Sequence, residues 1–326
     1  MEKRKIKWGI IGLGNIASQF ASDLLVLQDA ELTAVASRDF SKGQQFAEKF
    51  NAFKVYDSYD LIFADLEVEI IYIATPHNSH AELSIKALEN GKHVLCEKPM
   101  ALSYQDAVRI VEASKKHNRF FMEAFWTRFI PSIQDVLQKV NKGVIGDVNY
   151  INADFAFYGS ETENKRLFDK KLGGGALFDI GVYPLFLSYI LLGNPKEILA
   201  KAVMHKNEVD LQTSIILQYE SAQAVLHASI VSDSDMKASI SGTEGRIHLN
   251  SPWYIADGYS LFENGAKEAV FSLSYLGKGY AHEAIECHDC IRNNQIESEL
   301  WSHQNSLDLS KIVEEIKTQI KLSFLF

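Results

Sequence analysis

The segment from Trp8 to Ala17 constrains the fold of this chain more than any other. It reads Trp-Gly-Ile-Ile-Gly-Leu-Gly-Asn-Ile-Ala, so an apolar run leads into glycines and a small residue spaced as G-x-G-x-x-A. Between a strand and a helix, the first glycine permits a tight turn, the second lets a pyrophosphate approach main-chain N–H groups, and the small third residue allows close packing. The segment therefore predicts a strand–turn–helix unit that binds a dinucleotide, against the alternative of a glycine turn without a ligand. The expected contacts are Gly12, Gly14, Asn15 and Ile16.

From Lys5 to Ala124, short β-branched runs alternate with longer amphipathic stretches, which is the pattern of βαβ units around a parallel sheet. The strands expected from the apolar runs are 5–11, 31–36, 69–74, 92–96 and 120–124, with a weaker one at 54–55. The helices expected between them are 15–27, 41–50, 58–63, 79–90 and 103–117. Two helix starts are indicated by capping pairs, Ser79 with Glu82 and Ser103 with Asp106. Gly91 indicates the C-terminal end of a helix.

After about Pro131, polar and apolar residues alternate as they do in antiparallel strands. The expected strands are 148–158, 198–204, 212–219, 224–232, 237–241 and 246–250, and the expected helices are 177–192, 281–292 and 306–324. The predicted fold class is therefore α/β plus α+β, with an N-terminal Rossmann domain, a doubly wound parallel sheet, at 1–124. A substrate-binding and dimerisation domain with a large, mostly antiparallel open sheet follows at 125–326, and its last helix is a candidate to pack back on the first domain. Because an open sheet face needs a cover, we expect a homodimer through this sheet.

The composition disfavours several classes of partner. With 33 Lys and Arg against 42 Asp and Glu, the formal net charge is -9, which disfavours an extended basic surface for nucleic acid. We expect no apolar run of the roughly 18–20 residues that span a bilayer, and the N-terminal residues run into a strand pattern without a signal-peptide core. Three cysteines are too few for a disulfide framework and suit a reducing compartment. The expectation is a cytoplasmic protein that binds neither nucleic acid nor membranes.

The end of the second expected strand bears on the choice of nicotinamide cofactor. An acidic residue there binds the ribose 2′-OH of NAD, whereas a basic residue accommodates the 2′-phosphate of NADP. The stretch 34–39 reads Ala-Val-Ala-Ser-Arg-Asp, with Lys42 one turn further on. Since the Arg38 guanidinium can make a charge-assisted contact to phosphate, Ser37, Arg38 and Lys42 predict NADP(H). In the alternative, Asp39 binds the ribose and NAD(H) is used as well.

Two further segments carry side chains suited to acid–base chemistry. Glu97-Lys98-Pro99 follows the fifth expected strand, at the carboxyl edge where doubly wound sheets bind ligands. An ammonium group there can hold a substrate oxygen and lower the pKa of a neighbouring phenol or imidazole. In the stretch 173–184, three glycines precede Asp179 and Tyr183, which share one face if the helix is regular. In the alternative interpretations, Lys98 is a surface lysine, Asp179 caps a helix and Tyr183 is a core aromatic residue.

Taken in this order, the motifs resemble the glucose–fructose oxidoreductase and inositol dehydrogenase family (Gfo/Idh/MocA). The residues that carry the resemblance are the G-x-G-x-x-A motif, Glu97-Lys98-Pro99 and Asp179-x-x-x-Tyr183. The stretches 94–99, 122–129 and 173–184 are most similar to the dimeric dihydrodiol dehydrogenases, also described as NADP-dependent D-xylose dehydrogenases. Many members of the wider family have histidine at the position of Tyr183. The similarity covers about the first two thirds of the chain and reappears at 290–292 and 297–298.

The resemblance implies an NADP-dependent oxidoreductase that acts on a carbinol or hemiacetal carbon of a sugar, such as D-xylose or D-glucose, or of a vicinal diol. Tyr183 would remove the hydroxyl proton, Lys98 would lower the pKa of the phenol, and Asp179 would orient the substrate or the lysine. The cofactor site would extend to Thr75, Pro76, His80 and Glu97, and the substrate pocket to His77, Trp126 and Phe155. The two aromatic residues suit plain core positions equally well, and His80 suits a helix start near the cofactor.

Other functions compete with that of a dehydrogenase. A lyase or hydrolase could use a tightly held nicotinamide for transient oxidation, and a non-catalytic protein could sense a dinucleotide with the same fold. Cys287 and Cys290 imitate a metal-binding C-x-x-C, but they lie in a helical pattern without a second ligand pair. No metal site is therefore predicted.

Overall fold

The computed structural model describes residues 4–324, which divide into two compact units. The first comprises the described residues up to Phe129 together with Tyr275–Leu307. The second comprises Ile130–Ser274 together with the described residues from Asp308 onwards. The helix α9 (His303–Gln319) begins in the first unit and ends in the second.

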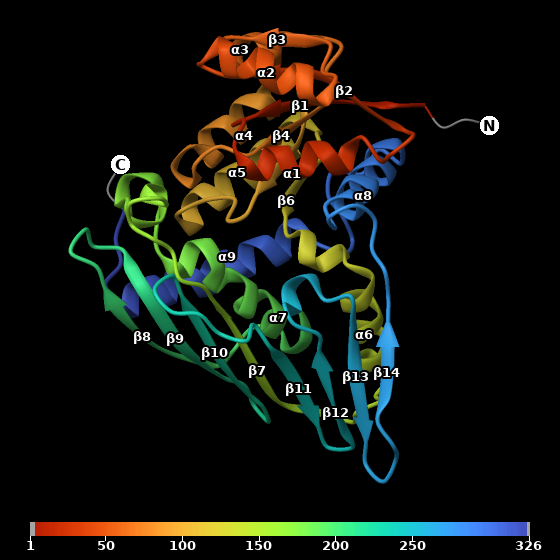
Figure 1. Ribbon diagram of the computed structural model, residues 1–326, viewed down its shortest axis with the longest axis vertical. Coiled ribbons are helices and arrows are strands. Elements are labelled where there is room, and N and C mark those ends of the chain that lie inside the picture. The colour runs from red at the N-terminus through yellow and green to blue at the C-terminus, as the bar shows by residue number, and fades with distance from the viewer. Residues whose placement is uncertain (1–3, 325–326) are drawn as a thin grey trace. The chain divides into compact units, whose positions relative to one another are not determined.

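The first unit is built on a parallel sheet (Figure 1). Among its described residues, six strands follow the order β3-β2-β1-β4-β5-β6. The strands are β1 (Ile6–Ile11), β2 (Ala30–Ala36), β3 (Lys54–Tyr56), β4 (Ile70–Ile73), β5 (His93–Glu97) and β6 (Phe121–Ala124). The helices are α1 (Asn15–Leu24), α2 (Phe40–Phe50), α3 (Tyr59–Ala64), α4 (His80–Glu89), α5 (Tyr104–His117) and α8 (Ala281–Arg292). This strand order is that of the doubly wound Rossmann fold, so the predicted parallel sheet is confirmed.

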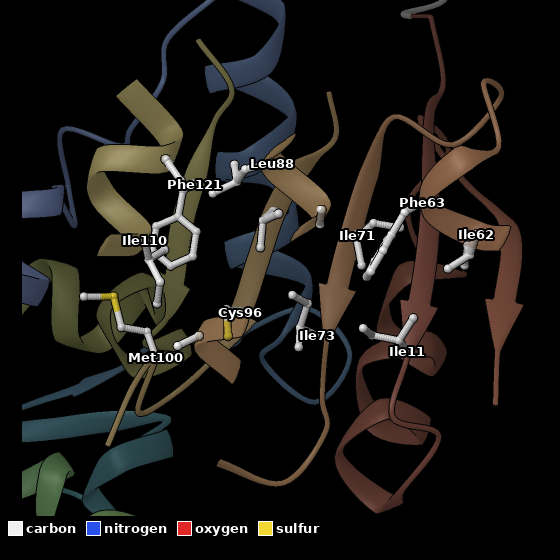
Figure 2. Close-up of a cluster of buried hydrophobic side chains, with 14 of the residues drawn as sticks. Ile11, Ile62, Phe63, Ile71, Ile73, Leu88, Cys96, Met100, Ile110 and Phe121 are labelled. Carbon is white, nitrogen blue, oxygen red and sulfur yellow. The ribbon is translucent and has the colours of Figure 1, made fainter. Parts of the chain in front are cut away.

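The core of this unit follows from the apolar strands. Every residue of β4 and β6 is buried, as expected for parallel strands that are covered on both faces. Figure 2 shows part of the core, in which Ile11, Ile73 and Phe121 belong to one buried cluster. Burial of such side chains stabilises the fold by roughly 1.5–3 kcal/mol each.

Helix α8 belongs to this unit although it lies far from it in the sequence. Its His288 accepts a hydrogen bond at Nε2 from the Trp8 indole (2.9 Å). The carboxylate of Asp23 on α1 accepts the main-chain N–H groups of Lys278 (2.8 Å) and Ala281 (3.1 Å) just before and at the start of the helix. These buried contacts fix the first turn of α8 against α1.

The second unit is built on a larger sheet that is antiparallel except for one pair. Its described strands form an eight-stranded sheet in the order β14-β13-β12-β11-β7-β10-β9-β8, and only β7 and β10 pair in parallel. The strands are β7 (Val148–Ala156), β8 (Glu197–Met204), β9 (Asp210–Gln218), β10 (Gln223–Ser229), β11 (Ala238–Gly242), β12 (Gly245–Leu249), β13 (Gly258–Glu263) and β14 (Ala269–Ser272). The predicted mostly antiparallel sheet is confirmed.

Helices lie on one face of this sheet and close one of its edges. The helix α7 (Val182–Leu192) packs on β7 and β10, and α6 (Pro131–Asn141) is tied to β13 by a hydrogen bond between the Asp135 carboxylate and the Tyr259 hydroxyl. At the edge strand β8, the Gln319 side chain accepts the Ala200 N–H (2.9 Å) and donates to the Ile198 carbonyl (2.7 Å). The outward main-chain groups at this point of β8 are therefore paired within the unit.

Several local predictions are corrected by the structure. Ser79 does not cap α4, because its hydroxyl donates to Pro76 O and Thr75 Oγ1 (2.8 Å each) within a 3-10 turn, and the helix begins at His80. Ser103, by contrast, caps α5 as predicted by accepting the Asp106 N–H (3.1 Å). The helix α6 and the strands β13 and β14 were not expected. The strand β14 has only four residues, whereas Pro131 at the first position of α6 is a helix-start signal that the prediction missed.

The helical stretch Lys170–Leu192 also departs from the expectation for long apolar runs. By length and composition alone it could cross a membrane, with a mean hydropathy of 1.7. However, 78% of the 18-residue window that has this mean hydropathy is buried inside the structure. Burial of this kind is the pattern of a core helix, so the stretch is weak evidence for a membrane span.

Candidate active site

The glycine motif forms a turn that fits the pyrophosphate of a dinucleotide. Gly12 has φ +80, and a Cβ there would lie 2.4 Å from the Thr75 nitrogen, so glycine lets the end of β1 approach the end of β4. Gly14 is exposed and open above its Cα, and the first turn of α1 has neither a side-chain cap nor an acidic residue. Its main-chain N–H groups, including those of the exposed Asn15 and Ile16, suit an anion at a helix N-terminus. The predicted strand–turn–helix unit is confirmed.

The residues after β2 divide into exposed cations and a carboxylate that serves the backbone. The Asp39 carboxylate caps α2 by accepting the Lys42 N–H (3.1 Å), and the Ser37 hydroxyl accepts the Asp39 N–H (3.2 Å). The side chains of Arg38 and Lys42 are exposed beside this turn. An incoming ligand therefore meets basic groups here, while the nearby carboxylate is already used within the helix end.

His80 links the loop after β4 to the turn that carries Lys98. Its ring is fully buried, with Nε2 2.8 Å from the Thr75 carbonyl oxygen and Nδ1 2.8 Å from the Pro99 carbonyl oxygen. The neighbouring His77 is buried and meets this ring edge-on, at 5.6 Å between centroids. Two main-chain segments are thereby held by one side chain.

The Lys98 turn is held on its other side by a buried carboxyl group. Glu123 on β6 accepts the Met100 N–H at Oε1 (2.9 Å), and burial raises the pKa of this carboxyl. Lys98 itself is half-buried. Because Pro99 and Met100 are both tied to buried side chains, the backbone that carries the lysine is fixed before any ligand binds.

A second buried carboxyl group lies in α8. Glu283 is fully buried, and within residues 4–324 neither of its oxygens has a hydrogen-bond partner. Burial raises its pKa well above the usual range, and the charges of Glu97 and Asp23 raise it further. Glu97, which directly precedes Lys98, is buried and accepts a hydrogen bond from the Tyr72 hydroxyl. Burial and the neighbouring carboxylates therefore favour the uncharged form of Glu283, and this form limits the negative charge in this part of the core.

In the second unit, the candidate residues follow a π-helical turn, Leu177–Gly181, that runs into α7. The turn replaces the regular helix assumed for the Asp179–Tyr183 spacing, and such turns are frequent at functional sites. The buried Asp210 fixes its start, since Oδ2 accepts the Leu177 N–H (2.7 Å) and the Thr213 hydroxyl (2.6 Å). Pro184 lies in the first turn of α7, where a missing N–H donor is tolerated.

Tyr183 lies in an aromatic cluster of this unit. Its ring centroid is 5.3 Å from that of Phe155 on β7 and 5.6 Å from that of Tyr254, which lies between β12 and β13. Phe155 and Tyr254 are stacked at 4.3 Å with an interplanar angle of 8°. Asp179, on the preceding turn, forms an ion pair with Arg166 (2.5 Å between Oδ1 and Nη2). The carboxylate of this ion pair therefore lies on the turn that leads into the helix with Tyr183.

The predicted site residues are distributed over both units. Those in the first unit are Gly12, Gly14, Asn15, Ile16, Ser37, Arg38, Lys42, Thr75, Pro76, His77, His80, Glu97, Lys98 and Trp126. Those in the second are Phe155, Asp179 and Tyr183. Within the first unit, Trp126 stacks on Tyr280 at 4.5 Å, which places the start of α8 beside an expected pocket wall.

Sequence reasoning missed Tyr254, Arg166, Glu123 and Glu283. Arg166 could have been suspected, because it precedes the glycine-rich segment by only a few residues in a run of cations. Glu123 and Glu283 lie in strand and helix patterns that look like ordinary core, and Tyr254 lies in a short turn between two strands, so their roles depend on tertiary contacts. Cys287 and Cys290 are buried thiols in α8, and the described residues contain no cluster of three or more side chains suited to a metal ion.

Two protein-family models match successive parts of this chain. Residues 6–125 match the family model described as "Oxidoreductase family, NAD-binding Rossmann fold", and residues 133–248 match the GFO/IDH/MocA C-terminal domain. The chain belongs to the GFO/IDH/MocA oxidoreductase family. As a member of this family with an NAD(P)-binding Rossmann domain, it is an NAD(P)-dependent oxidoreductase of the dihydrodiol dehydrogenase and sugar oxidoreductase type.

Relatives and solved structures match nearly the whole chain of this family member. It is 34% identical over 332 residues to the trans-1,2-dihydrobenzene-1,2-diol dehydrogenase of Xenopus tropicalis, covering 98% of this chain and 99% of the relative. The enzyme of the same name from Mus musculus is also 34% identical, with 98% of each chain covered. The comparisons do not favour a lyase, a hydrolase or a non-catalytic sensor.

Solved structures of the family have the same fold. A variant of a 3-ketoreductase from Actinomadura kijaniata, in complex with TDP-benzene and NADP, has a TM-score of 0.88 at 24% identity and covers 97% of this chain and 98% of its own. The aldose-aldose oxidoreductase from Caulobacter crescentus has a TM-score of 0.88 at 23% identity, with 98% of each chain covered.

The buried acid in α8 generates a prediction about stability. A raised pKa means that Glu283 binds its proton more tightly in the folded state, so its contribution to stability is lost as pH rises above the unfolded value near 4.5. We expect Glu283→Gln to unfold like the wild type near pH 4 and to gain stability at higher pH, by up to about 1.4 kcal/mol per pH unit. Thermal unfolding between pH 4 and 8 measures this difference, with the exposed Glu89→Gln as control. A pH-independent difference would contradict the assignment.

Proposed function

We propose that the protein transfers hydride between NADP(H) and a carbinol or hemiacetal carbon of an aldose, such as D-xylose or D-glucose, or of a vicinal diol. The observation that carries the proposal is the arrangement around Tyr183, whose phenol lies among Phe155 and Tyr254 directly after the turn that holds Asp179. Flat aromatic rings suit the C–H faces of sugars and the rings of dienes. Two relatives named for a diol substrate and a fold neighbour named for aldoses support this class of substrate.

In the proposed reaction, a nicotinamide bound in the first unit would supply the acceptor for the hydride that leaves the substrate C–H bond. The Tyr183 phenolate takes the hydroxyl proton, so the oxygen electrons form the carbonyl group. A phenol has a usual pKa near 10, and the positive charge of Lys98 would lower it toward neutral pH. Proton transfer of this kind contributes roughly 10²–10⁴-fold to the rate.

The catalytic assignment predicts the behaviour of two variants. We expect Tyr183→Phe and Lys98→Met each to lower kcat by about 10²-fold or more while NADPH still binds, because each removes a group needed only in the transition state. The measurement is nicotinamide absorbance with a panel of aldoses, inositols and diols, together with a fluorescence titration of NADPH. The exposed Tyr158→Phe and Lys86→Met serve as controls. Rates close to those of the wild type in either active-site variant would refute the roles given.

We propose NADP(H) as the preferred cofactor, although NAD(H) fits the same cradle. The carboxylate of Asp39 is engaged as the cap of α2, which leaves Arg38 and Lys42 as the exposed charged groups for a ribose 2′-phosphate. A fold neighbour was solved with NADP, which supports the same preference.

The preference for NADP(H) predicts a selective effect of Arg38→Ala. We expect the KM for NADP+ to rise about ten- to hundredfold and the KM for NAD+ to change little, because hydrogen bonds to charged groups contribute about 1.5–3 kcal/mol. Initial rates with both cofactors give the two constants, and Lys49→Ala, an exposed cation on α2, is the control. Equal changes for the two cofactors would end this assignment.

We propose that two copies of the chain associate through the outward face of the second unit's sheet. The register places Leu199, Ile216 and Val225 side by side on β8, β9 and β10, and all three are exposed. Tyr150 on β7 and Val203 on β8 extend this apolar surface. An exposed apolar row on a sheet face is typical of a protein–protein contact, and the same surface on a second copy would cover it.

The proposed dimer predicts a specific change of oligomeric state. We expect the wild type to elute as a dimer and Ile216→Glu to elute as a monomer, because the charge would be buried in the middle of the contact. Size-exclusion chromatography with light scattering measures the mass, and Leu66→Glu, at an exposed leucine of the first unit, is the control. A monomeric wild type at micromolar concentration would exclude the dimer.

We also propose a cytoplasmic location. Cys96, Cys287 and Cys290 are buried thiols without disulfide bonds, which suits a reducing compartment.

A further inference from the structure

The ion pair between Arg166 and Asp179 links two parts of the second unit that are thirteen residues apart in sequence. Asp179 lies on the π-helical turn before Tyr183, and Arg166 lies in a short 3-10 turn, Lys165–Phe168. The Arg166 side chain is 39% exposed and that of Asp179 is 15% exposed. The pair is therefore partly shielded from water, so it is stronger than a fully exposed one.

The backbone around Arg166 is built so that its guanidinium reaches this carboxylate. A Cβ at Gly174 would lie 2.5 Å from the Leu167 carbonyl oxygen and 2.6 Å from that of Arg166, so only glycine lets the chain pass this close. The Gly175 N–H donates to the Leu167 carbonyl (2.8 Å), which ties the glycine segment to the 3-10 turn.

The rest of the 3-10 turn is anchored as well. Leu167 and Phe168 are buried, and the Asn207 amide donates to the Phe168 carbonyl (3.0 Å). Of the three glycines, Gly174 thus allows the close backbone approach beside Arg166. These contacts fix the backbone of Arg166, although its side chain is partly exposed.

We propose that Arg166 is a positioning residue that holds the Asp179 carboxylate to accept a hydrogen bond from the substrate hydroxyl next to the reacting carbon. The proposal rests on the proposed function and names the feature that Asp179 would recognise in its substrates, a second hydroxyl group next to the reacting carbon. A carboxylate is an acceptor only, so it selects for a donor at that place. The Arg166 guanidinium restricts the orientation of this carboxylate through the ion pair.

The effect of losing this contact follows from the cost of misplacement. A shift of about 1 Å in a positioning group can lower the rate about 10²-fold. Without the guanidinium, the Asp179 carboxylate loses one of the contacts that fix its orientation. Lysine at this position keeps the charge but lacks the planar fork, so it restores only part of the effect.

A double-mutant cycle tests the proposal. We expect Arg166→Gln to lower kcat/KM about 10- to 100-fold, Arg166→Lys to lower it less, and Arg166→Gln with Asp179→Asn to be no worse than Asp179→Asn alone. Lys165→Gln, which removes an exposed cation from the same turn, is the matched control and should leave kcat/KM unchanged. Gly174→Ala should repeat the loss seen with Arg166→Gln through displacement of the backbone.

A second measurement separates positioning from a general loss of structure. The ratio of kcat/KM for a substrate and its deoxy analogue, such as D-glucose and 2-deoxy-D-glucose or a cyclic diol and its mono-alcohol, reports the hydrogen bond to the second hydroxyl. We expect this ratio to fall about tenfold or more in Arg166→Gln and Asp179→Asn and to stay at the wild-type value in Lys165→Gln. A lower fraction of folded protein would not change the ratio.

The outcomes distinguish this proposal from the function on which it rests. Additive effects in the cycle, an unchanged substrate ratio, or an equal loss in Lys165→Gln would overturn the role of Arg166 while the wild type remains an active dehydrogenase. A loss confined to anionic substrates would overturn it as well, because it would show direct binding by the guanidinium. A wild type that turns over no sugar or diol would overturn the proposed function and the positioning role together.

Discussion

The close approach of Gly12 to the backbone at Ala74 and Thr75 is the contact on which the candidate cofactor site of the first unit depends. It brings the phosphate turn against the end of β4 with no side chain between them. From there a continuous series of contacts leads through Thr75 to His80 and on to Pro99, next to Lys98. The glycine motif and the lysine are thus mechanically connected, although 86 positions separate Gly12 from Lys98 in the sequence.

In the second unit, glycines also allow close contacts, here around the π-helical turn that carries Asp179. Gly174 lets the chain pass closely behind Arg166, and Gly175, with φ +114, leaves room for the buried Asp210 carboxylate that holds the start of the π-helical turn. Both glycines act by the absence of a side chain, and both serve the turn that carries Asp179. In each unit, therefore, backbone contacts made possible by glycine fix a charged side chain before substrate arrives.

Much of the fold could be predicted from the sequence because local signals agreed with tertiary structure. The apolar runs of the parallel sheet and the alternating runs of β7 to β12 gave strands within a few residues of their observed bounds. The four-residue β14 carried too little local signal, whereas α6 was overlooked although Pro131 opens it and its buried residues Ile133, Val136 and Leu137 follow a helical spacing. The family motifs led to Lys98, Asp179 and Tyr183, whereas Tyr254 and Glu283 could not be found, because their significance depends on neighbours distant in sequence. The capping role assigned to Ser79 failed because Thr75 and Pro76 compete for its hydroxyl.

The pairing of Gln319 with β8 has a consequence for how the protein avoids fibrous aggregation. An edge strand with open N–H and C=O groups is a template on which another chain can add a strand, and repeated addition has no natural end. Because the amide of Gln319 occupies the Ala200 N–H and the Ile198 carbonyl, this edge offers an incoming strand an interrupted ladder. One side-chain amide thus disfavours the addition of a further strand at the β8 edge of the sheet.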